Sequence, residues 1–185
     1  MKRVFDLLAS LGGLLLLGWL IVLLAWLAGR DGDAPGLFRQ ARVGRDERVF
    51  TCLKLRTMRA DTAAAATHDT PAYAVTPLGA RLRRWKLDEL PQLVNVLRGE
   101  MSLVGPRPSL PIQHDVVEAR RRRGVLRLRP GITGLAQVQG IDMQDPERLA
   151  EVDAQYLATR SFIGDLALIL RTVTGSGQGD HVRRA

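Results

Sequence analysis

Apolar residues form one continuous run near the start of the chain and are scattered through the rest of it. No residue between Leu7 and Gly29 carries a charge. As a helix this run would extend ~35 Å, slightly more than the ~30 Å hydrocarbon core of a bilayer. We therefore predict that it holds the protein at a membrane. Cleavage as a signal peptide is disfavoured, because the run exceeds a usual signal-peptide core and Trp26 stands where a cleavage site near Ala28 needs a small residue.

Basic residues flank this run on both sides, with Lys2-Arg3 before it and several arginines between Arg30 and Arg48 after it. Positive charge marks cytoplasmic flanks, so a single straight span does not satisfy both ends. A re-entrant helix pair, which enters and leaves on one face, does satisfy them. Gly12-Gly13 or Gly18 would supply the weak point of such a bend. No proline interrupts the run, so the charge pattern leaves both a re-entrant helix and a plain spanning anchor open.

Between Leu37 and Met58 the hydrophobic pattern has a period of two residues, unlike the continuous apolar run before it. This period predicts extended structure, and Gly44–Glu47 is typical of a turn between two strands. On the second strand Lys54 and Arg56 would point to the same side. The pattern therefore predicts a short β-hairpin that presents two cations on one face.

Capping residues mark two helices in the remaining chain. Thr76-Pro77 combines a capping side chain with a proline at the first helical position and predicts a basic helix to about Lys86. Asp145-Pro146 has the same arrangement and predicts a helix to about Arg160.

Three further helices and three loops are expected from the spacing of apolar residues and of helix breakers. The helices would cover Pro91–Arg98, His114–Arg123 and Phe162–Val173. The last of them is apolar and would lie on the bilayer or pack in the core. The loops would cover Ala60–Tyr73, Ser102–Pro111 and Leu128–Gly140.

The elements together predict a mixed α/β chain that is mostly helical. We expect a membrane helix over residues 1–30, a small cytosolic domain with a short β-hairpin and interfacial amphipathic helices over 31–174, and a polar tail over 175–185. At this length the chain supports one modest domain beside the membrane segment.

The net charge of the chain indicates which classes of molecule it binds. Lysine and arginine number 27 against 19 acidic residues, which gives a net charge of +8. An anionic partner is indicated, either lipid headgroups, a phosphorylated substrate or nucleic acid. Cys52 is the single cysteine, which excludes a disulfide within the chain and a metal site built from its thiolates alone. The three histidines are scattered, which argues against a His-rich metal site.

The adjacent acids Asp88-Glu89 are the strongest candidates for chemistry. They lie at the predicted junction into the Pro91–Arg98 helix, whose N-terminus favours carboxylates and phosphate groups. An ionised aspartate can attack phosphorus, and a neighbouring glutamate can hold Mg²⁺ together with substrate phosphates. The plainer alternative is that both acids only cap the helix.

Several cations are placed to bind phosphate. Arg83 lies just before the acidic pair, Arg107 stands between two prolines and Arg129 precedes Pro130-Gly131. Proline-fixed loops aim a guanidinium well. With Lys54 and Arg56 on the predicted strand, they favour a phosphoryl-transfer site, although any one arginine alone is more often a solvated surface charge.

The basic run Arg120–Arg123 has three interpretations: a solvated helix face, a headgroup-binding patch or a nucleic-acid patch. Aromatic residues make up 5% of the chain, and none interleaves with this run. Base stacking is therefore disfavoured, and nucleic acid is not expected as a partner. Beside a membrane segment, anionic lipid is the better candidate.

Four stretches together resemble the bacterial sugar transferases known as small monotopic phosphoglycosyl transferases. They are FRQARVGR (Phe38–Arg45), KLRTM (Lys54–Met58), LDELPQLVNVLRGEMSLVGPRP (Leu87–Pro108) and RPGITGLAQVQG (Arg129–Gly140). The likeness runs from Lys2 to about Val173. The Leu87–Pro108 block is long and specific.

The resemblance implies an enzyme that moves a sugar phosphate from a UDP-sugar to polyprenyl (undecaprenyl) phosphate and releases UMP. It implies Mg²⁺, ping-pong order and an aspartyl-phosphosugar intermediate, with Asp88 as nucleophile and Glu89 as the metal carboxylate. Lys54, Arg83 and Arg107 would serve the phosphates. It also implies a re-entrant membrane helix, a catalytic domain on the cytoplasmic face of the bacterial inner membrane, and a role early in glycoconjugate assembly. A homodimer stays open.

Two positions depart from the family pattern. A proline is usual midway through the membrane segment, where this chain has Gly18-Trp19, and Gln139 stands where asparagine is frequent. Two hypotheses of other classes also stay open at this stage. One is a membrane-tethered nucleic-acid-binding protein, and the other is a non-catalytic adaptor of a glycan assembly machine.

Overall fold

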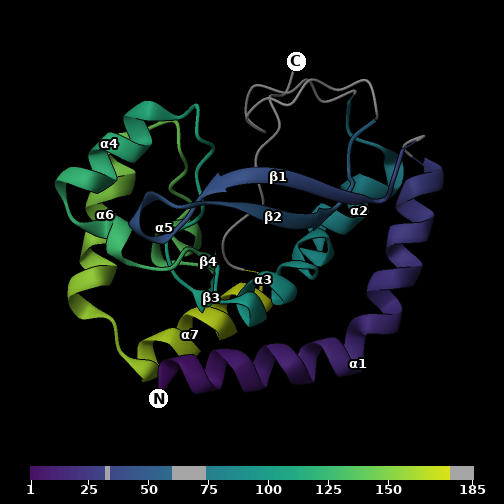
Figure 1. Cartoon of the computed structure of the whole chain (residues 1–185), viewed down its shortest axis with the longest axis horizontal. Coiled ribbons are helices and arrows are strands. Elements are labelled where there is room, and N and C mark those ends of the chain that lie inside the picture. Colours follow the sequence, from purple (N-terminus) through teal and green to yellow (C-terminus); the bar gives the residue numbers. More distant parts are fainter. Residues whose placement is uncertain (32–33, 60–73, 176–185) are drawn as a thin grey trace.

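The computed structural model describes residues 1–31, 34–59 and 74–175. The loop expected over Ala60–Tyr73 lies outside these ranges, as does the tail after Gly175. Within them the chain is mixed α/β and mostly helical, with a long apolar helix first and a β-hairpin next, as the sequence predicts. Figure 1 shows the helices arranged around the hairpin.

The first helix, α1 (Lys2–Asp31), contains the apolar run. Among the described residues it is the one helix long and apolar enough to cross a membrane, and 6% of its most apolar window is buried. Figure 1 shows that α1 changes direction along its length: its first part runs beneath α7 and α3, and its second part rises beside α2. Three of its residues are buried, Asp6, Ser10 and Ala28.

Both ends of α1 are bonded to the rest of the protein. At its start, Lys2 Nζ lies 2.6 Å from Asp165 Oδ2, and Asp6 Oδ2 accepts a 2.8 Å hydrogen bond from Ser102 Oγ. At its end, Asp31 Oδ2 accepts a 3.2 Å hydrogen bond from Leu78 N. The bend and these contacts place the two ends of an apolar helix on one globular unit.

The hairpin consists of β1 (Leu37–Val43) and β2 (Val49–Leu55), antiparallel in the register Leu37↔Leu55 and Val43↔Val49. The expected turn is a short 3-10 helix, η1 (Arg45–Glu47). The prediction of two strands with a turn between them is therefore confirmed. Lys54 belongs to β2, whereas Arg56 lies just beyond its end.

The capped helices form where the sequence predicts them. They are α2 (Pro77–Arg84) and α6 (Pro146–Thr159). Thr76 Oγ1 accepts from Gly79 N at 3.0 Å, and Asp145 Oδ1 accepts from Arg148 N at 3.0 Å. The other three expected helices are also present, as α3 (Gln92–Arg98), α4 (His114–Arg122) and α7 (Phe162–Val173).

Two stretches expected to be loops contain regular structure, so those predictions are wrong in part. A parallel pair of short strands joins β3 (Ser102–Val104) to β4 (Gly131–Thr133), and a short helix, α5 (Leu135–Val138), follows. The backbones approach closely here, since a Cβ on Gly131 would lie 2.1 Å from Gly105 N. Glycines that look like loop residues are needed for this packing.

The core forms between these elements as three adjoining groups of buried apolar side chains. One lies between the hairpin and α3 and includes Phe50, Cys52, Val96 and Met101. The others pack α6 against α7 and α6 against α4 and α5. The turn between α2 and α3 lies beside β2 and carries Asp88 and Glu89.

Candidate active site

The acidic pair lies in a one-turn 3-10 helix, η4 (Leu87–Glu89), between α2 and α3. Lys86 starts this turn in the left-handed region, with φ 55°. A left-handed non-glycine residue costs roughly 1–2 kcal/mol, and such strain often marks functional sites. Asp88 and Glu89 are 8% and 9% exposed. Carboxylates are seldom buried to this degree unless they are paired, so capping alone does not account for them.

Glu89 is held by cations from two distant segments. Arg107 Nη1 donates to Glu89 Oε1 at 2.9 Å, from the loop that follows β3. Lys54 Nζ lies 3.4 Å from the same oxygen and comes from β2. The side chains of Lys54 and Arg107 are 15% and 18% exposed, so both cations meet the carboxylate in a partly desolvated site.

Arg83 approaches from the last turn of α2. Its Nε donates to Thr57 Oγ1 at 2.9 Å, which fixes the guanidinium beside the end of the hairpin. Its charge acts on Asp88 together with those of Lys54 and Arg107. The structure therefore brings together five of the residues that the sequence singled out, Lys54, Arg83, Asp88, Glu89 and Arg107.

Burial sets the acidity of the central carboxylate. Burial and the adjacent Glu89 charge raise the pKa of Asp88 and the three nearby cations lower it, and the result of these effects together is a pKa of about 6. The cations therefore do not fully offset desolvation. Asp88 is still mostly ionised at neutral pH but is weakly solvated, and a carboxylate in this state is a good nucleophile.

Two of the expected phosphate-binding arginines lie elsewhere. Arg56 Nε donates to Pro35 O at 2.8 Å, and its guanidinium stacks over Phe38 with a centroid distance of 5.3 Å. Arg129 Nε donates to Gly99 O at 2.8 Å, at the end of α3. Both side chains therefore bond to backbone carbonyls and hold neighbouring segments together.

Asn95 is a site-supporting residue that the sequence analysis missed. Its side chain is fully buried in α3, where Oδ1 accepts from Leu53 N at 3.0 Å and Nδ2 donates to Thr51 O at 2.7 Å. These bonds fix α3, and with it the turn that carries the acids, against β2. An asparagine on the buried face of a short helix was the available signal.

The site has the donor chemistry that magnesium requires. In the part of the chain that the structure describes, no group of three or more His, Cys, Asp or Glu side chains is placed to hold a metal ion by itself. Mg²⁺ is commonly bound by one or two carboxylates, with substrate phosphates and water as the other ligands. The Asp88-Glu89 pair fits that pattern. It does not fit a site in which the protein supplies every ligand, because two carboxylates are too few.

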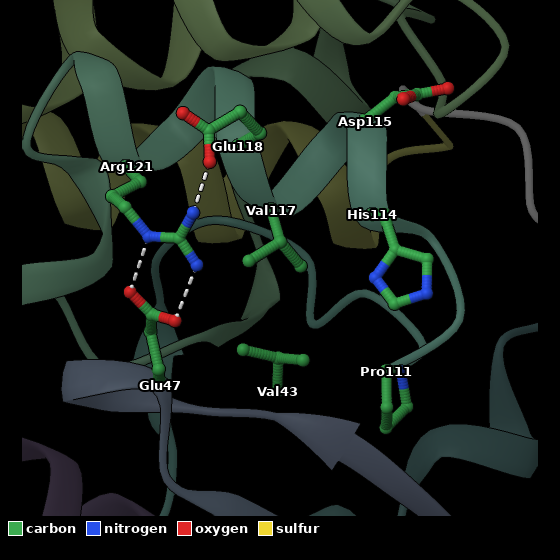
Figure 2. A pocket seen from close by; sticks show the side chains of 8 residues that line it. All are labelled: Val43, Glu47, Pro111, His114, Asp115, Val117, Glu118 and Arg121. Atoms are coloured by element: carbon green, nitrogen blue, oxygen red, sulfur yellow. Dashed lines mark hydrogen bonds and ion pairs between the residues drawn. The ribbon is translucent and has the colours of Figure 1, made fainter.

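The basic run of α4 is paired with acids. Arg121 contacts Glu47 at 2.7 Å and also contacts Glu118, while Arg122 and Arg123 contact Glu147. Figure 2 shows Arg121 between its two carboxylates, in a groove of about 510 Å³ between the hairpin tip and α4. Figure 1 shows α4 on the opposite side of the molecule from the first part of α1. This arrangement favours the solvated-face interpretation over lipid or nucleic-acid binding.

Known proteins resemble the chain along nearly its whole length. A family model described as bacterial sugar transferase matches residues 1–178. A UDP-glucose:undecaprenyl-phosphate glucose-1-phosphate transferase of Caulobacter vibrioides is 41% identical over 93% of this chain and 68% of its own length. A UDP-galactose-lipid carrier transferase of Erwinia amylovora is 38% identical over 94% of this chain. The exopolysaccharide production protein ExoY of Rhizobium meliloti is 37% identical over 93% of this chain and 83% of its own. The chain spans 39% of the Erwinia relative.

Proposed function

The chain belongs to the bacterial sugar transferase family, and we propose that it transfers a sugar 1-phosphate from a UDP-sugar to undecaprenyl phosphate, the step that initiates exopolysaccharide synthesis. The observation that carries this proposal is the buried Asp88-Glu89 pair, with cations from three other segments around it. The functions of the two similar transferases from Caulobacter vibrioides and Erwinia amylovora support it.

The chemistry assigned to Asp88 is a double displacement at one phosphorus atom. A carboxylate oxygen of Asp88 attacks the phosphorus that bears the sugar, and the bond from that phosphorus to the bridging pyrophosphate oxygen breaks. UMP leaves with the bonding electron pair. A phosphate oxygen of undecaprenyl phosphate then attacks the same phosphorus, and the bond to Asp88 breaks. The products are a sugar linked to the lipid through a diphosphate and a regenerated carboxylate.

The cations and Glu89 have separate roles in this proposal. Lys54, Arg83 and Arg107 offset the charge of the pyrophosphate, so that an anionic nucleophile can approach phosphorus. Glu89 holds Arg107 and Lys54 in place before substrate binds. Glu89 would also hold Mg²⁺, which supplies further neutralisation of phosphate charge when bound.

We also propose that α1 is re-entrant and that the domain lies on the cytoplasmic face of the inner membrane. A straight span would place the two ends of α1 on opposite sides of a ~30 Å hydrocarbon layer. Lys2 and Asp31 instead both contact the same folded domain. The exposed apolar side chains of α7, including Ile163 and Leu170, extend the lipid-facing surface.

The proposal is tested by UMP release. Purified protein in detergent is supplied with undecaprenyl phosphate, Mg²⁺ and a panel of UDP-sugars. Sustained release of UMP over many turnovers, dependent on one UDP-sugar and on the lipid phosphate, is expected. No release from any donor in the panel, with a folded protein, would contradict the proposed activity.

A further inference from the structure

A buried ion pair lies behind the candidate active site, between α4 and α6. Arg120 and Asp153 are 3% and 2% exposed. Arg120 Nη2 lies 2.7 Å from Asp153 Oδ2, and Arg120 Nε donates to the same oxygen at 2.9 Å. The third guanidinium nitrogen, Nη1, donates to the backbone carbonyl of Arg107 at 2.8 Å. The pair therefore reaches the segment that supplies Arg107 to the site.

Stability alone does not explain this pair. Removing two charges from water costs several kcal/mol per ion, and apolar side chains of similar size often give an equally stable or more stable protein. Desolvation raises the pKa of Asp153, which shows that burial opposes its charged form. A role for the bond to Arg107 would account for keeping the charges.

The loop that follows β3 needs donors from outside itself. Pro106 and Pro108 have no backbone N–H, so this segment is poorly suited to pairing as a strand. Its carbonyls accept bonds from other elements instead. Pro106 O accepts from Gly131 N at 2.9 Å, and Ser109 O accepts from Val43 N at 2.9 Å.

Buried guanidinium groups hold the two carbonyls between these. Arg107 O accepts from Arg120, and Pro108 O accepts from Arg42 Nη1 at 2.9 Å. Proline rings restrict φ, and these bonds fix the direction of the peptide groups. The backbone of Arg107 is thereby held on both sides of the Cα from which its side chain reaches Glu89.

We propose that Arg120, oriented by Asp153, is a positioning residue that fixes the Arg107 backbone so that the Arg107 guanidinium meets Glu89 and the substrate phosphates. The proposal rests on the proposed function and extends it to a pair that does not touch substrate. A displacement of about 1 Å at a charged contact can cost as much as 100-fold in rate. The carbonyl contact of Arg120 is therefore expected to matter for turnover.

A double-mutant cycle on UMP release tests the proposal. Arg120→Lys keeps a buried cation for Asp153 but cannot hold both Asp153 and the Arg107 carbonyl in the same way. In the wild-type background it is expected to lower kcat/KM about tenfold or more. In an Arg107→Lys background it is expected to lower it less than about threefold, because the group that it positions is already changed.

A matched control separates positioning from general destabilisation. Val152→Ala changes a fully buried α6 side chain next to Asp153 and leaves the carbonyl contact in place. It should lower the melting temperature, and any effect on kcat/KM should be the same in both Arg107 backgrounds. Full effects of Arg120→Lys in both backgrounds would overturn the proposal, as would wild-type kcat/KM for Arg120→Lys.

A second variant tests the same proposal in the event that Arg120→Lys folds poorly. The double substitution Arg120→Met/Asp153→Leu replaces the pair with apolar groups and is expected to retain a cooperative melt. Its kcat/KM should still fall about tenfold or more, since the carbonyl donor is absent. Wild-type kcat/KM in this stable variant would overturn the positioning role. Absence of UMP release from the wild-type protein would instead contradict the proposed function.

Discussion

Arg107 Nη1 lies 2.9 Å from Glu89 Oε1, although the two residues come from different segments and are 18 positions apart. This contact joins the proline-rich loop after β3 to the turn that carries the acidic pair. It shows that Glu89 organises the cations of the site in the protein alone. In the proposed mechanism, the neighbouring Asp88 is the carboxylate that attacks phosphorus.

Replacing the proposed nucleophile should abolish the reaction. Asp88→Asn keeps the size of the side chain but removes the anionic oxygen that would bond to phosphorus. UMP release is expected to fall by at least about 1,000-fold, and intact-protein mass spectra should lose the sugar-phosphate adduct that trapping gives for the wild type. Near-normal turnover by this variant would remove Asp88 from the mechanism.

Activity should decline in mild acid. Burial raises the pKa of Asp88 to about 6, so its nucleophilic form is depleted below that pH. We expect kcat/KM for the UDP-sugar to fall about tenfold per pH unit below about 6. The pH–rate profile measures this directly, and a profile that stays flat down to pH 5 would contradict the assignment.

The same shift has a consequence for stability. Because the pKa of Asp88 is higher in the folded protein than in the unfolded chain, the folded state binds more protons between about pH 4 and pH 6. Ionisation of Asp88 therefore reduces stability as pH rises through this window. At pH 8, Asp88→Asn should unfold with a free energy on the order of 1–3 kcal/mol above the wild type. Below about pH 4 the two proteins should be equally stable, as measured by denaturant titration.

Neutralising Glu89 should separate cation binding from catalysis. Glu89→Gln removes the charge that Arg107 and Lys54 contact, so both cations become more available to phosphate. UDP binding measured without Mg²⁺ should tighten, while turnover and its dependence on Mg²⁺ should both decrease. Glu118→Gln, on the exposed surface of α4, is the control and should behave as the wild type. Weaker UDP binding by Glu89→Gln would contradict this role.

The close contact between Gly36 and α1 should not tolerate a side chain at Gly36. A Cβ there would lie 1.6 Å from Ala25 O, so Gly36→Ala must separate the hairpin from α1. A loss of about 2–4 kcal/mol in unfolding free energy is expected in detergent. Gly12→Ala is the control, because nothing lies within 4 Å of the added methyl. It should be neutral or stabilising by up to about 1 kcal/mol.

Local signals identified most elements, because their causes lie within a few residues. Thr76 and Asp145 cap the helices that they predict, and Gly99 ends α3 with φ 85°. The pairing of β3 with β4 was missed, because it depends on the contact between Gly105 and Gly131, which are distant in sequence. Short parallel strands give little periodicity to detect.

The site was identified as a set of residues, but the sequence did not distinguish contact with the acids from support of the backbone. The period of two predicted that Lys54 and Arg56 point to the same side of the strand, although Arg56 lies beyond β2 and bonds to Pro35. The basic run Arg120–Arg123 is a similar case, because the sequence analysis did not distinguish the buried Arg120 from its neighbours. Arg120 falls on the same face of α4 as Val116 and Val117, which is the pattern of a buried residue.

In the proposed re-entrant arrangement, the attachment of α1 at both ends sets the height of the acids above the lipid relative to a single leaflet. Arg3 Nη2 donates to Val96 O at 2.8 Å, near the end of the helix that starts just after the acids. A shift of α1 toward or away from the bilayer midplane would carry this helix with it. Bilayers of different total thickness should therefore present the lipid phosphate to Asp88 at the same level, provided that their headgroup regions are alike.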